Sequence, residues 1–277
     1  MRRTSSTFSA ADGLTLFERH WLPEGAARAD VVIVHGYAEH SGRYEHVGTL
    51  LAERGYAVHA FDLRGHGQSA GPRVLVRSAA EYLDDLDAFL ARSRTSGRPL
   101  FLLGHSMGGT IVTLEVIERA PAIDGLILSG PALTAVGTSP IVARIVQLLG
   151  RFLPRLRLRK LDAAAVCRDP AVVAAYESDP LVDRGKMYAG TAAAMMRAMR
   201  AIDRGAQRVH VPLLVMHGTE DRLADPQGSR ALHERASSPD KTLRLYAGLY
   251  HEIFNEPEQR EVLGDLLAWL DARTSGG

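Results

Sequence analysis

Two serines lie in a Gly-x-Ser-x-Gly pattern, which is typical of a nucleophilic serine. Ser106 directly follows the apolar run 100–103 and leads into the helix-like segment GTIVTLEVIERA. A serine between a strand and a helix is exposed on a sharp turn, and its flanking glycines let the chain pass close to its neighbours. Ser69 instead lies in a loop that continues into Ala-Gly-Pro, a poor start for a helix. We therefore predict Ser106 as a nucleophile and Ser69 as a loop residue.

Such a serine needs a base to take its proton and an acid to orient that base, and on a strand–turn–helix fold these follow in the order acid, then histidine. Two histidines come after the strand expected at 211–217: His233 in a helix-like segment, and His251 in a loop beyond the last expected strand. Ligand sites collect at the carboxyl ends of parallel strands, so we predict His251 as the base. The loop after 211–217 offers three acids, which spacing alone leaves open: Glu220, Asp221 and Asp225.

The oxyanion formed by serine attack on a carbonyl needs two N–H donors held in place. One is expected from Met107, the residue after the nucleophile. The other is expected from the loop after the apolar run 31–34, where Gly36 allows a close turn. We assign this second donor to the backbone N–H of Tyr37.

The elements that must position these residues alternate between strand and helix along most of the chain. This order predicts an α/β fold with a mostly parallel central sheet flanked by helices. An antiparallel pair is expected at 7–10 and 14–23, around the Asp12-Gly13 turn. The other strands are expected at 31–34, 56–62, 100–103, 123–129, 211–217 and 242–246, and the helices at 44–54, 78–94, 107–120, 226–236 and 257–272.

One stretch, from about residue 134 to residue 208, interrupts this order because it contains helical segments and no good strand. An insertion of this length is too long for a simple connection between two strands. We therefore predict a core made of residues 1–133 and 209–277. Residues 134–208 are expected to form a separate helical cap over one edge of the sheet.

The composition excludes several classes of protein. Of 277 residues, 46% are hydrophobic and 23% charged, which is typical of a globular chain and not of a disordered one. Lys and Arg number 33 against 32 Asp and Glu, so the net charge of +1 argues against a nucleic-acid partner. The single cysteine, Cys167, excludes an internal disulfide. No apolar run is long enough to span a membrane and no signal-peptide pattern is visible, so we expect a cytoplasmic protein.

Each candidate also has a plain structural interpretation. Ser106 could cap a helix, Asp221 could be a turn residue and His251 a surface histidine. Three further histidines share no helix face and are joined by no cysteine, so we predict no metal site: His35, His40 and His46. Serine chemistry of this kind needs no cofactor.

Several segments carry a resemblance that covers nearly the whole chain: 35–44, which includes EHSGRY, 62–69, 104–109, 217–223, and 250–252 followed by 255–258. They resemble the monoacylglycerol lipase family of α/β-hydrolases. This resemblance implies an α/β-hydrolase fold, a triad of Ser106, Asp221 and His251, and a cap over an acyl tunnel. It also implies a polar glycerol site near Glu39, Arg43, His105 and Tyr176. A second histidine that some members carry after the catalytic one is replaced here by Phe254.

The expected cap contains a basic segment, residues 140–160, which has no acidic residue. Its cations are Arg144, Arg151, Arg155, Arg157, Arg159 and Lys160. Apolar residues recur within it at helical spacing: Val142, Ile145, Val146, Leu149 and Leu153. One interpretation is a basic amphipathic helix that docks peripherally on a membrane, and the other is a cap helix that buries this stripe. Clustered methionines further along either line an acyl tunnel or pack within the cap: Met187, Met195, Met196 and Met199.

Together these features predict a serine esterase that cleaves a single-chain lipid ester, a monoacylglycerol, into fatty acid and glycerol. A lysophospholipase, a general small-ester carboxylesterase or a cofactor-free peroxidase could use the same triad. From a different class, the fold could serve a non-catalytic binding protein, because fold does not determine function.

Overall fold

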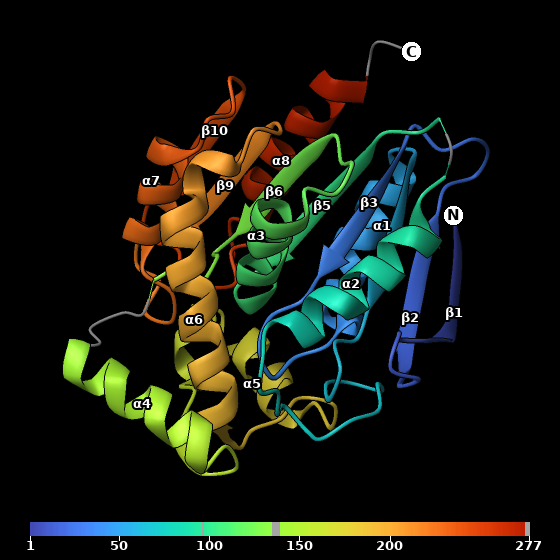
Figure 1. Cartoon of the computed structure of the whole chain (residues 1–277). Helices are drawn as coiled ribbons and strands as arrows, with labels where there is room; N and C mark the ends of the chain where they lie inside the picture. Colours follow the sequence, from blue (N-terminus) through green and yellow to red (C-terminus); the bar gives the residue numbers. More distant parts are fainter. Residues whose placement is uncertain (96, 135–138, 275–277) are drawn as a thin grey trace.

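The centre of the molecule is a mixed, mostly parallel sheet (Figure 1). The computed structural model describes residues 1–95, 97–134 and 139–274, and within these ranges the sheet has eight strands in the order β1-β2-β4-β3-β5-β6-β9-β10. β1, β2 and β4 pair antiparallel, and the pairings from β4 to β10 are parallel. The strands are β1 (Arg2–Ser9), β2 (Thr15–Leu22), β3 (Ala29–Val34), β4 (Tyr56–Phe61), β5 (Leu100–His105), β6 (Gly125–Ser129), β9 (Leu213–Gly218) and β10 (Lys241–Tyr246).

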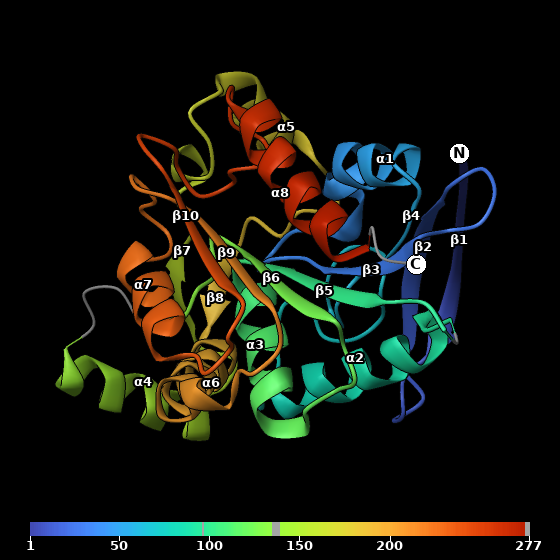
Figure 2. The same cartoon turned by 90° about the horizontal axis from the view of Figure 1, so that it is seen from above.

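Helices cover both faces of this sheet. Figure 2 shows α1 (Glu45–Glu53) and α8 (Gln259–Thr274) on one side, and α2 (Ala80–Ser93), α3 (Met107–Arg119) and α7 (Pro226–Arg235) on the other. In β3, Val31 and Ile33 pack into the core on the α1 side, while Val32 and Val34 pack into the core on the α2 side. Burial on both faces is why this strand is a continuous apolar run rather than an alternating one.

The expected core elements are confirmed, with ends that differ by a few residues. The largest difference is in the first strand, which begins at Arg2 and pairs with β2 along its whole length, whereas the sequence predicts a start at Thr7. Most of β1 is exposed at the sheet edge. Its polar outer half therefore lacks the apolar pattern by which a strand is recognised.

Between β6 and β9 the chain leaves the sheet. This stretch contains α4 (Pro140–Phe152), α5 (Pro170–Ser178) and α6 (Ala189–Gly205), with short 3-10 turns at Ala163–Ala165 and Ala206–Arg208; another such turn, Ser41–Tyr44, precedes α1. The expectation of no strand here is wrong, because β7 (Arg157–Lys160) and β8 (Lys186–Tyr188) pair antiparallel. Both are very short, and β7 is the charged run RLRK, so neither shows apolar alternation.

α6 packs against α3, which places this stretch beside the carboxyl ends of the parallel strands. The division into a core of 1–133 and 209–277 and a cap of 134–208 stays a prediction. None of the described helices combines the length and the hydropathy that crossing a membrane requires.

Candidate active site

Ser106 lies at the turn between β5 and α3, so the predicted strand–turn–helix context is confirmed. Its φ of 52° and ψ of −118° fall in a region that residues other than glycine rarely adopt. The turn also presses against β3, because a Cβ on Gly108 would lie 2.1 Å from the carbonyl oxygen of Val34. Strained backbone of this kind persists where the surrounding structure holds it, and it is concentrated at functional sites.

Asp221 and His251 meet although they come from loops after different strands, β9 and β10. Asp221 Oδ2 lies 2.7 Å from His251 Nδ1. Glu220 is exposed, and Asp225 caps the start of α7 with its side chain. His233 lies within α7, as expected. Of the three acids that spacing leaves open, Asp221 is the one that contacts the predicted base.

The surroundings of Asp221 keep it ionised. Its Oδ1 accepts the N–H groups of Leu223 at 2.8 Å and Ala224 at 2.9 Å, and its Oδ2 also lies 2.9 Å from His217 Nε2. Burial alone would raise the pKa of Asp221, but the charge of His251 and these hydrogen bonds outweigh it and hold the pKa below its usual value. In His251, burial alone would lower the pKa, but Asp221 raises it above the usual value. The pair is thus an ionised carboxylate in contact with an imidazole whose pKa it raises.

Ser106 and His251 line one cavity of about 220 Å³. Its apolar lining includes all the clustered methionines, Met187, Met195, Met196 and Met199, together with Leu161 and Leu223. Its polar lining includes Glu39, His105, Tyr176 and Glu252. Met196 and Met199 also border a groove of about 520 Å³ between α4, α6 and α7, whereas Glu39 and His105 border a small cavity beside Arg43. The side of the cavity that the methionines line, the methionine wall, therefore adjoins the groove. The side that the polar residues line, the polar wall, adjoins the small cavity beside Arg43.

The two residues predicted to supply oxyanion donors, Tyr37 and Met107, line the same cavity. Met107 is the first residue of α3, so its N–H has no acceptor within the helix, and the helix dipole favours negative charge there. Tyr37 follows β3 next to Gly36, where an added Cβ would lie 3.1 Å from the Cβ of Ser106. The loop that contains Tyr37 is therefore in close contact with Ser106.

The four residues implied for a glycerol site lie together, but they do not all line the cavity. Glu39, His105 and Tyr176 do, whereas Arg43 is not part of its wall and pairs with Glu39 at 3.0 Å. The Arg43 guanidinium also lies over the Tyr176 ring, 4.8 Å from its centre. One Glu39 oxygen accepts the Gly36 N–H at 2.6 Å. Arg43 is thus placed to organise the polar wall from outside.

Two residues at the site were not among those predicted from the sequence. Glu252, next to the predicted base, lines the cavity and binds the Arg43 guanidinium, with Nη2 to Oε2 at 2.8 Å. His217 contacts Asp221 from the end of β9. Glu252 is adjacent to His251 in the sequence, but its partner Arg43 is 209 residues away and only the fold brings the two together. His217 lies four residues before Asp221, so this spacing was the available signal for it.

The three histidines considered for a metal have separate partners. His35 accepts the N–H of Leu63 at 2.9 Å, and His46 lies 2.9 Å from the carbonyl oxygen of Phe254. His40 contacts the carboxylate of Asp179, which directly follows α5. Across the described ranges, no group of three or more His, Cys, Asp or Glu side chains is placed to hold a metal ion.

Known proteins are similar to this chain in both sequence and fold. Residues 25–258 match the family model described as serine aminopeptidase, S33. The chain is 42% identical to a monoacylglycerol lipase of Mycolicibacterium smegmatis over 97% of each chain, and 36% identical to the monoglyceride lipase of Homo sapiens over 96% of this chain and 89% of that one. The solved monoacylglycerol lipase of Paleococcus ferrophilus matches with a TM-score of 0.83 and 34% identity, covering 99% of this chain and 100% of that one. The chain therefore belongs to the monoacylglycerol lipase family of serine α/β-hydrolases.

Proposed function

We propose that this protein hydrolyses monoacylglycerols to a free fatty acid and glycerol. The observation that carries the proposal is the 2.7 Å contact between Asp221 and His251 at a cavity that Ser106 also lines. That cavity offers one ester both an apolar wall and a polar wall. The match to monoacylglycerol lipases over nearly the whole chain supports the same substrate class.

In the proposed reaction, Ser106 Oγ attacks the ester carbonyl while His251 Nε2 takes its proton. Asp221 holds the ring of His251 through Nδ1 and stabilises the imidazolium that forms. The N–H groups of Tyr37 and Met107 bind the oxyanion. The glycerol oxygen leaves with the proton from His251, and water then cleaves the acyl-enzyme by the same steps, releasing the fatty acid and restoring the serine.

His105 is the polar group that we expect to meet a glycerol hydroxyl. Its Nδ1 lies 2.9 Å from the Ser129 carbonyl oxygen, so Nδ1 carries the proton and Nε2 is an acceptor. Burial, together with the charge of nearby His251, lowers the pKa of His105 to about 4, so the ring stays neutral. The Glu39 oxygens are already occupied by Gly36, Arg43 and Tyr44. A hydroxyl donated to His105 would need no rearrangement of that cluster.

The test is fatty-acid release from 1-monooleoylglycerol, compared with a triacylglycerol emulsion and a lysophospholipid. We expect release from the monoester to be the fastest, and Ser106→Ala to reduce it by at least about 10³-fold. Ser69→Ala, the other Gly-x-Ser-x-Gly serine, is the matched control and should still react with a fluorophosphonate probe. Faster release from the lysophospholipid would mean that a lysophospholipid, and not a monoacylglycerol, is the substrate. If the probe did not label the wild type, a non-catalytic binding protein would be favoured.

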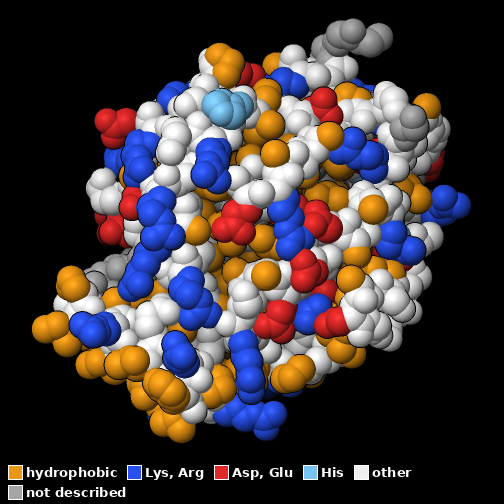
Figure 3. Space-filling model, viewed as in Figure 1, with side chains coloured by type: hydrophobic (Ala, Val, Ile, Leu, Met, Phe, Trp, Pro, Cys, Tyr) orange, Lys and Arg blue, Asp and Glu red, His pale blue; other side chains and the backbone are white. Residues whose placement is uncertain are grey.

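We also propose that α4 docks on an anionic membrane surface. Among the described residues, the exposed large hydrophobic side chains all lie in this helix and the turn after it: Ile141, Val142, Ile145, Leu148, Phe152, Leu153 and Leu156. Ile141 is 74% exposed and Phe152 is 69% exposed. In Figure 3 this apolar surface forms one projecting edge of the molecule, with cationic side chains beside it.

The opposite side of α4 faces the protein. The Gln147 amide donates to the Ala193 carbonyl oxygen in α6 at 3.1 Å, and a Cβ on Gly150 would lie 2.3 Å from the Ala193 Cβ. Of the stripe seen in the sequence, Val142, Ile145 and Leu153 are exposed, whereas Val146 and Leu149 are half-buried. The interpretation that the cap helix buries this stripe is therefore disfavoured, and an exposed apolar stripe flanked by arginines suits a lipid surface with negative headgroups.

Co-sedimentation with vesicles tests this docking. The wild type should bind phosphatidylglycerol-containing vesicles more than phosphatidylcholine vesicles, and salt should weaken the difference. Ile141→Ser with Phe152→Ser should reduce binding to both, whereas Arg151→Gln with Arg155→Gln should remove the preference for negative charge. Arg2→Gln with Arg244→Gln makes the same charge change outside α4 and should leave the preference intact. Equal binding to both vesicles at low salt would contradict the proposal.

A further inference from the structure

The loop that follows β3 contains a strained residue. Ala38 has a φ of 67°, in the left-handed region that favours glycine. It lies between Tyr37, the proposed oxyanion donor, and Glu39, whose carboxylate accepts the Gly36 N–H at 2.6 Å. This hydrogen bond closes a turn around Tyr37. Because such strain persists only where neighbouring groups hold it, the contacts of this loop decide where the Tyr37 N–H points.

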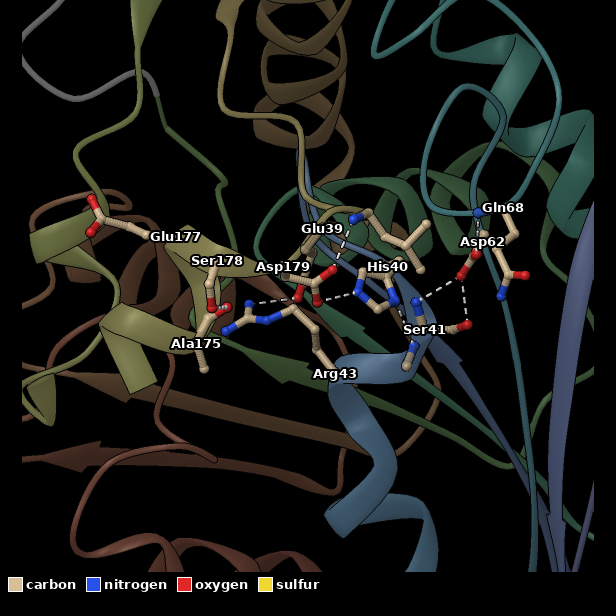
Figure 4. A network of polar contacts seen from close by, with 12 residues as sticks. Glu39, His40, Ser41, Arg43, Asp62, Gln68, Ala175, Glu177, Ser178 and Asp179 are labelled. Atoms are coloured by element: carbon tan, nitrogen blue, oxygen red, sulfur yellow. Dashed lines mark hydrogen bonds and ion pairs between the residues drawn. The ribbon is translucent and has the colours of Figure 1, made fainter. Parts of the chain in front are cut away.

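The core holds one end of the loop. Asp62 Oδ1 accepts from the Ser41 N–H at 2.8 Å and from the Ser41 hydroxyl at 2.6 Å, and its Oδ2 accepts from the Gln68 N–H at 2.8 Å. Figure 4 shows this carboxylate on one side of His40. These bonds fix the chain after His40 to the loop that follows β4. They do not reach the Ala38 carbonyl.

The cap holds the strained residue itself. We call residues 179–184, which follow α5, the strap. The Asp183 N–H donates to the Ala38 carbonyl oxygen at 2.8 Å, and Asp179 Oδ2 lies 2.8 Å from His40 Nε2. His40 Nδ1 accepts the N–H of Gly42, so Nε2 carries the proton and donates to Asp179, a contact drawn as a dashed line in Figure 4. The strap thus grips the loop on both sides of Glu39.

The strap is itself well braced. Asp179 Oδ1 accepts the Leu181 N–H at 2.8 Å, and Arg184 donates to the Asp179 carbonyl oxygen at 2.8 Å and to the Glu177 carbonyl oxygen, in α5, at 2.6 Å. Arg73, from the loop after β4, donates to the Leu181 carbonyl oxygen at 3.2 Å. The strap is therefore tied both to its own helix and to the core, and it can transmit a fixed position to the oxyanion loop.

We propose that Asp179 and His40 are positioning residues, through which the strap holds Ala38 in its left-handed conformation and aims the Tyr37 N–H at the oxyanion. The proposal rests on the proposed function, since it assigns the strap to a loop whose catalytic role is itself proposed. Neither side chain lines the cavity that contains Ser106. Losing the contact should therefore slow the chemical step and leave substrate binding along the methionine wall unchanged.

Kinetics of Asp179 variants test the proposal. We expect Asp179→Ala to lower kcat by about tenfold or more with KM within about twofold, because small displacements of catalytic donors are costly. Asp179→Asn, whose amide oxygen can still accept from His40, should recover part of the loss. Asp169→Asn makes the same charge change at the other end of α5, where Asn caps the helix equally well, and should behave like the wild type. A rise in KM with kcat unchanged in Asp179→Ala would overturn the proposal.

A double-mutant cycle separates positioning from general destabilisation. Glycine adopts the left-handed conformation without steric cost, so Ala38→Gly should make the loop depend less on the strap. We expect Asp179→Ala to reduce kcat at least about threefold less in the Ala38→Gly background than in the wild type. Equal losses in the two backgrounds would mean that Asp179 acts only through stability.

The rate at which a fluorophosphonate modifies Ser106 gives a readout that does not depend on the substrate assignment. The same oxyanion donors serve this reaction, so Asp179→Ala should slow it by a factor similar to its effect on kcat. If the wild type is labelled but does not cleave monoacylglycerol, the proposed substrate is wrong and the labelling ratio still tests the strap. If Asp179→Ala is labelled as fast as the wild type, the strap proposal is wrong whatever the substrate is.

Discussion

Two neighbouring histidines in the cavity have pKa values shifted in opposite directions, although both are buried. The rings of His105 and His251 lie 4.7 Å apart, centre to centre. Burial lowers the pKa of His105 to about 4, whereas in His251 the Asp221 carboxylate outweighs burial and raises the pKa. At neutral pH His105 is a neutral acceptor, and of the two rings His251 is the stronger base. The carboxylate contact therefore distinguishes the proposed base, His251, from its neighbour.

This difference predicts the pH dependence of the reaction. The base must be neutral to take the serine proton, so kcat/KM should fall as pH falls through the raised pKa of His251, with a midpoint above the ordinary value of about 6.5. Asp221→Asn should move this midpoint down and lower kcat by about 10³–10⁴-fold. His105→Gln should leave the midpoint in place, whatever its effect on the rate. The measurement is kcat/KM across pH, and a midpoint unchanged in Asp221→Asn would contradict the assignment of the pair.

At the scale of elements, the position of the proposed nucleophile, Ser106, depends on the close packing of three elements. β5 delivers Ser106, α3 carries the chain away, and the first turn of α3 lies against the end of β3. This contact leaves no space for a side chain at residue 108, because a Cβ added to Gly108 would lie only 2.1 Å from the Val34 carbonyl oxygen. A backbone oxygen in the middle of a sheet cannot move aside as a flexible side chain can.

We therefore expect Gly108→Ala to abolish activity and to destabilise the fold by about 2 kcal/mol or more, because α3 must shift away from β3. Gly264 in α8 is the matched control, since a Cβ there meets nothing within 4 Å. Gly264→Ala should instead stabilise the protein by about 0.5–1 kcal/mol, the usual gain from alanine in a helix. Thermal unfolding and ester hydrolysis measure both effects. Equal melting temperatures for the two variants would contradict this account.

At the scale of the whole molecule, a buried carboxylate lies within the helical layer on one face of the sheet. Glu115 in α3 is fully buried, and neither of its oxygens has a hydrogen-bond partner. Its closest cation is the Arg119 guanidinium, whose Nε lies 3.9 Å from Oε2. Burial, together with the negative charge of nearby Asp87, raises the pKa of Glu115 to about 9. The folded protein therefore keeps this group protonated at neutral pH.

This group should make the stability of the whole fold depend on pH. The unfolded chain releases the Glu115 proton near its usual pKa, whereas the folded chain holds it to about 9, so stability falls as pH rises between these values. Glu115→Gln should remove this slope and stabilise the protein by about 1–2 kcal/mol near pH 8. Glu118→Gln, exposed on the same helix, should change neither. Urea unfolding at several pH values would measure this, and parallel pH profiles for Glu115→Gln and the wild type would contradict it.

The sequence by itself determined the parts of this protein that depend on local pattern. Continuous apolar runs located the buried strands such as β3, since burial on both faces selects apolar residues at every position. The Gly-x-Ser-x-Gly motif between strand and helix located Ser106, because a Cβ at either glycine would clash with neighbouring atoms. β7 and β8 were missed because their short, polar sequences do not show the pattern that burial imposes.

Only the tertiary structure decided which distant groups meet. Spacing left Asp221, Glu220 and Asp225 open, and the contact that distinguishes them joins side chains 30 residues apart in the chain. The apolar stripe of α4 was compatible with burial or exposure, and the packing of its other face on α6 decided which side is exposed. The hydrogen bond between Asp183 and Ala38 is likewise not visible in the local sequence, because both of its groups belong to the backbone. Such contacts depend on how strands and loops pack in space, and residue type and spacing do not encode them locally.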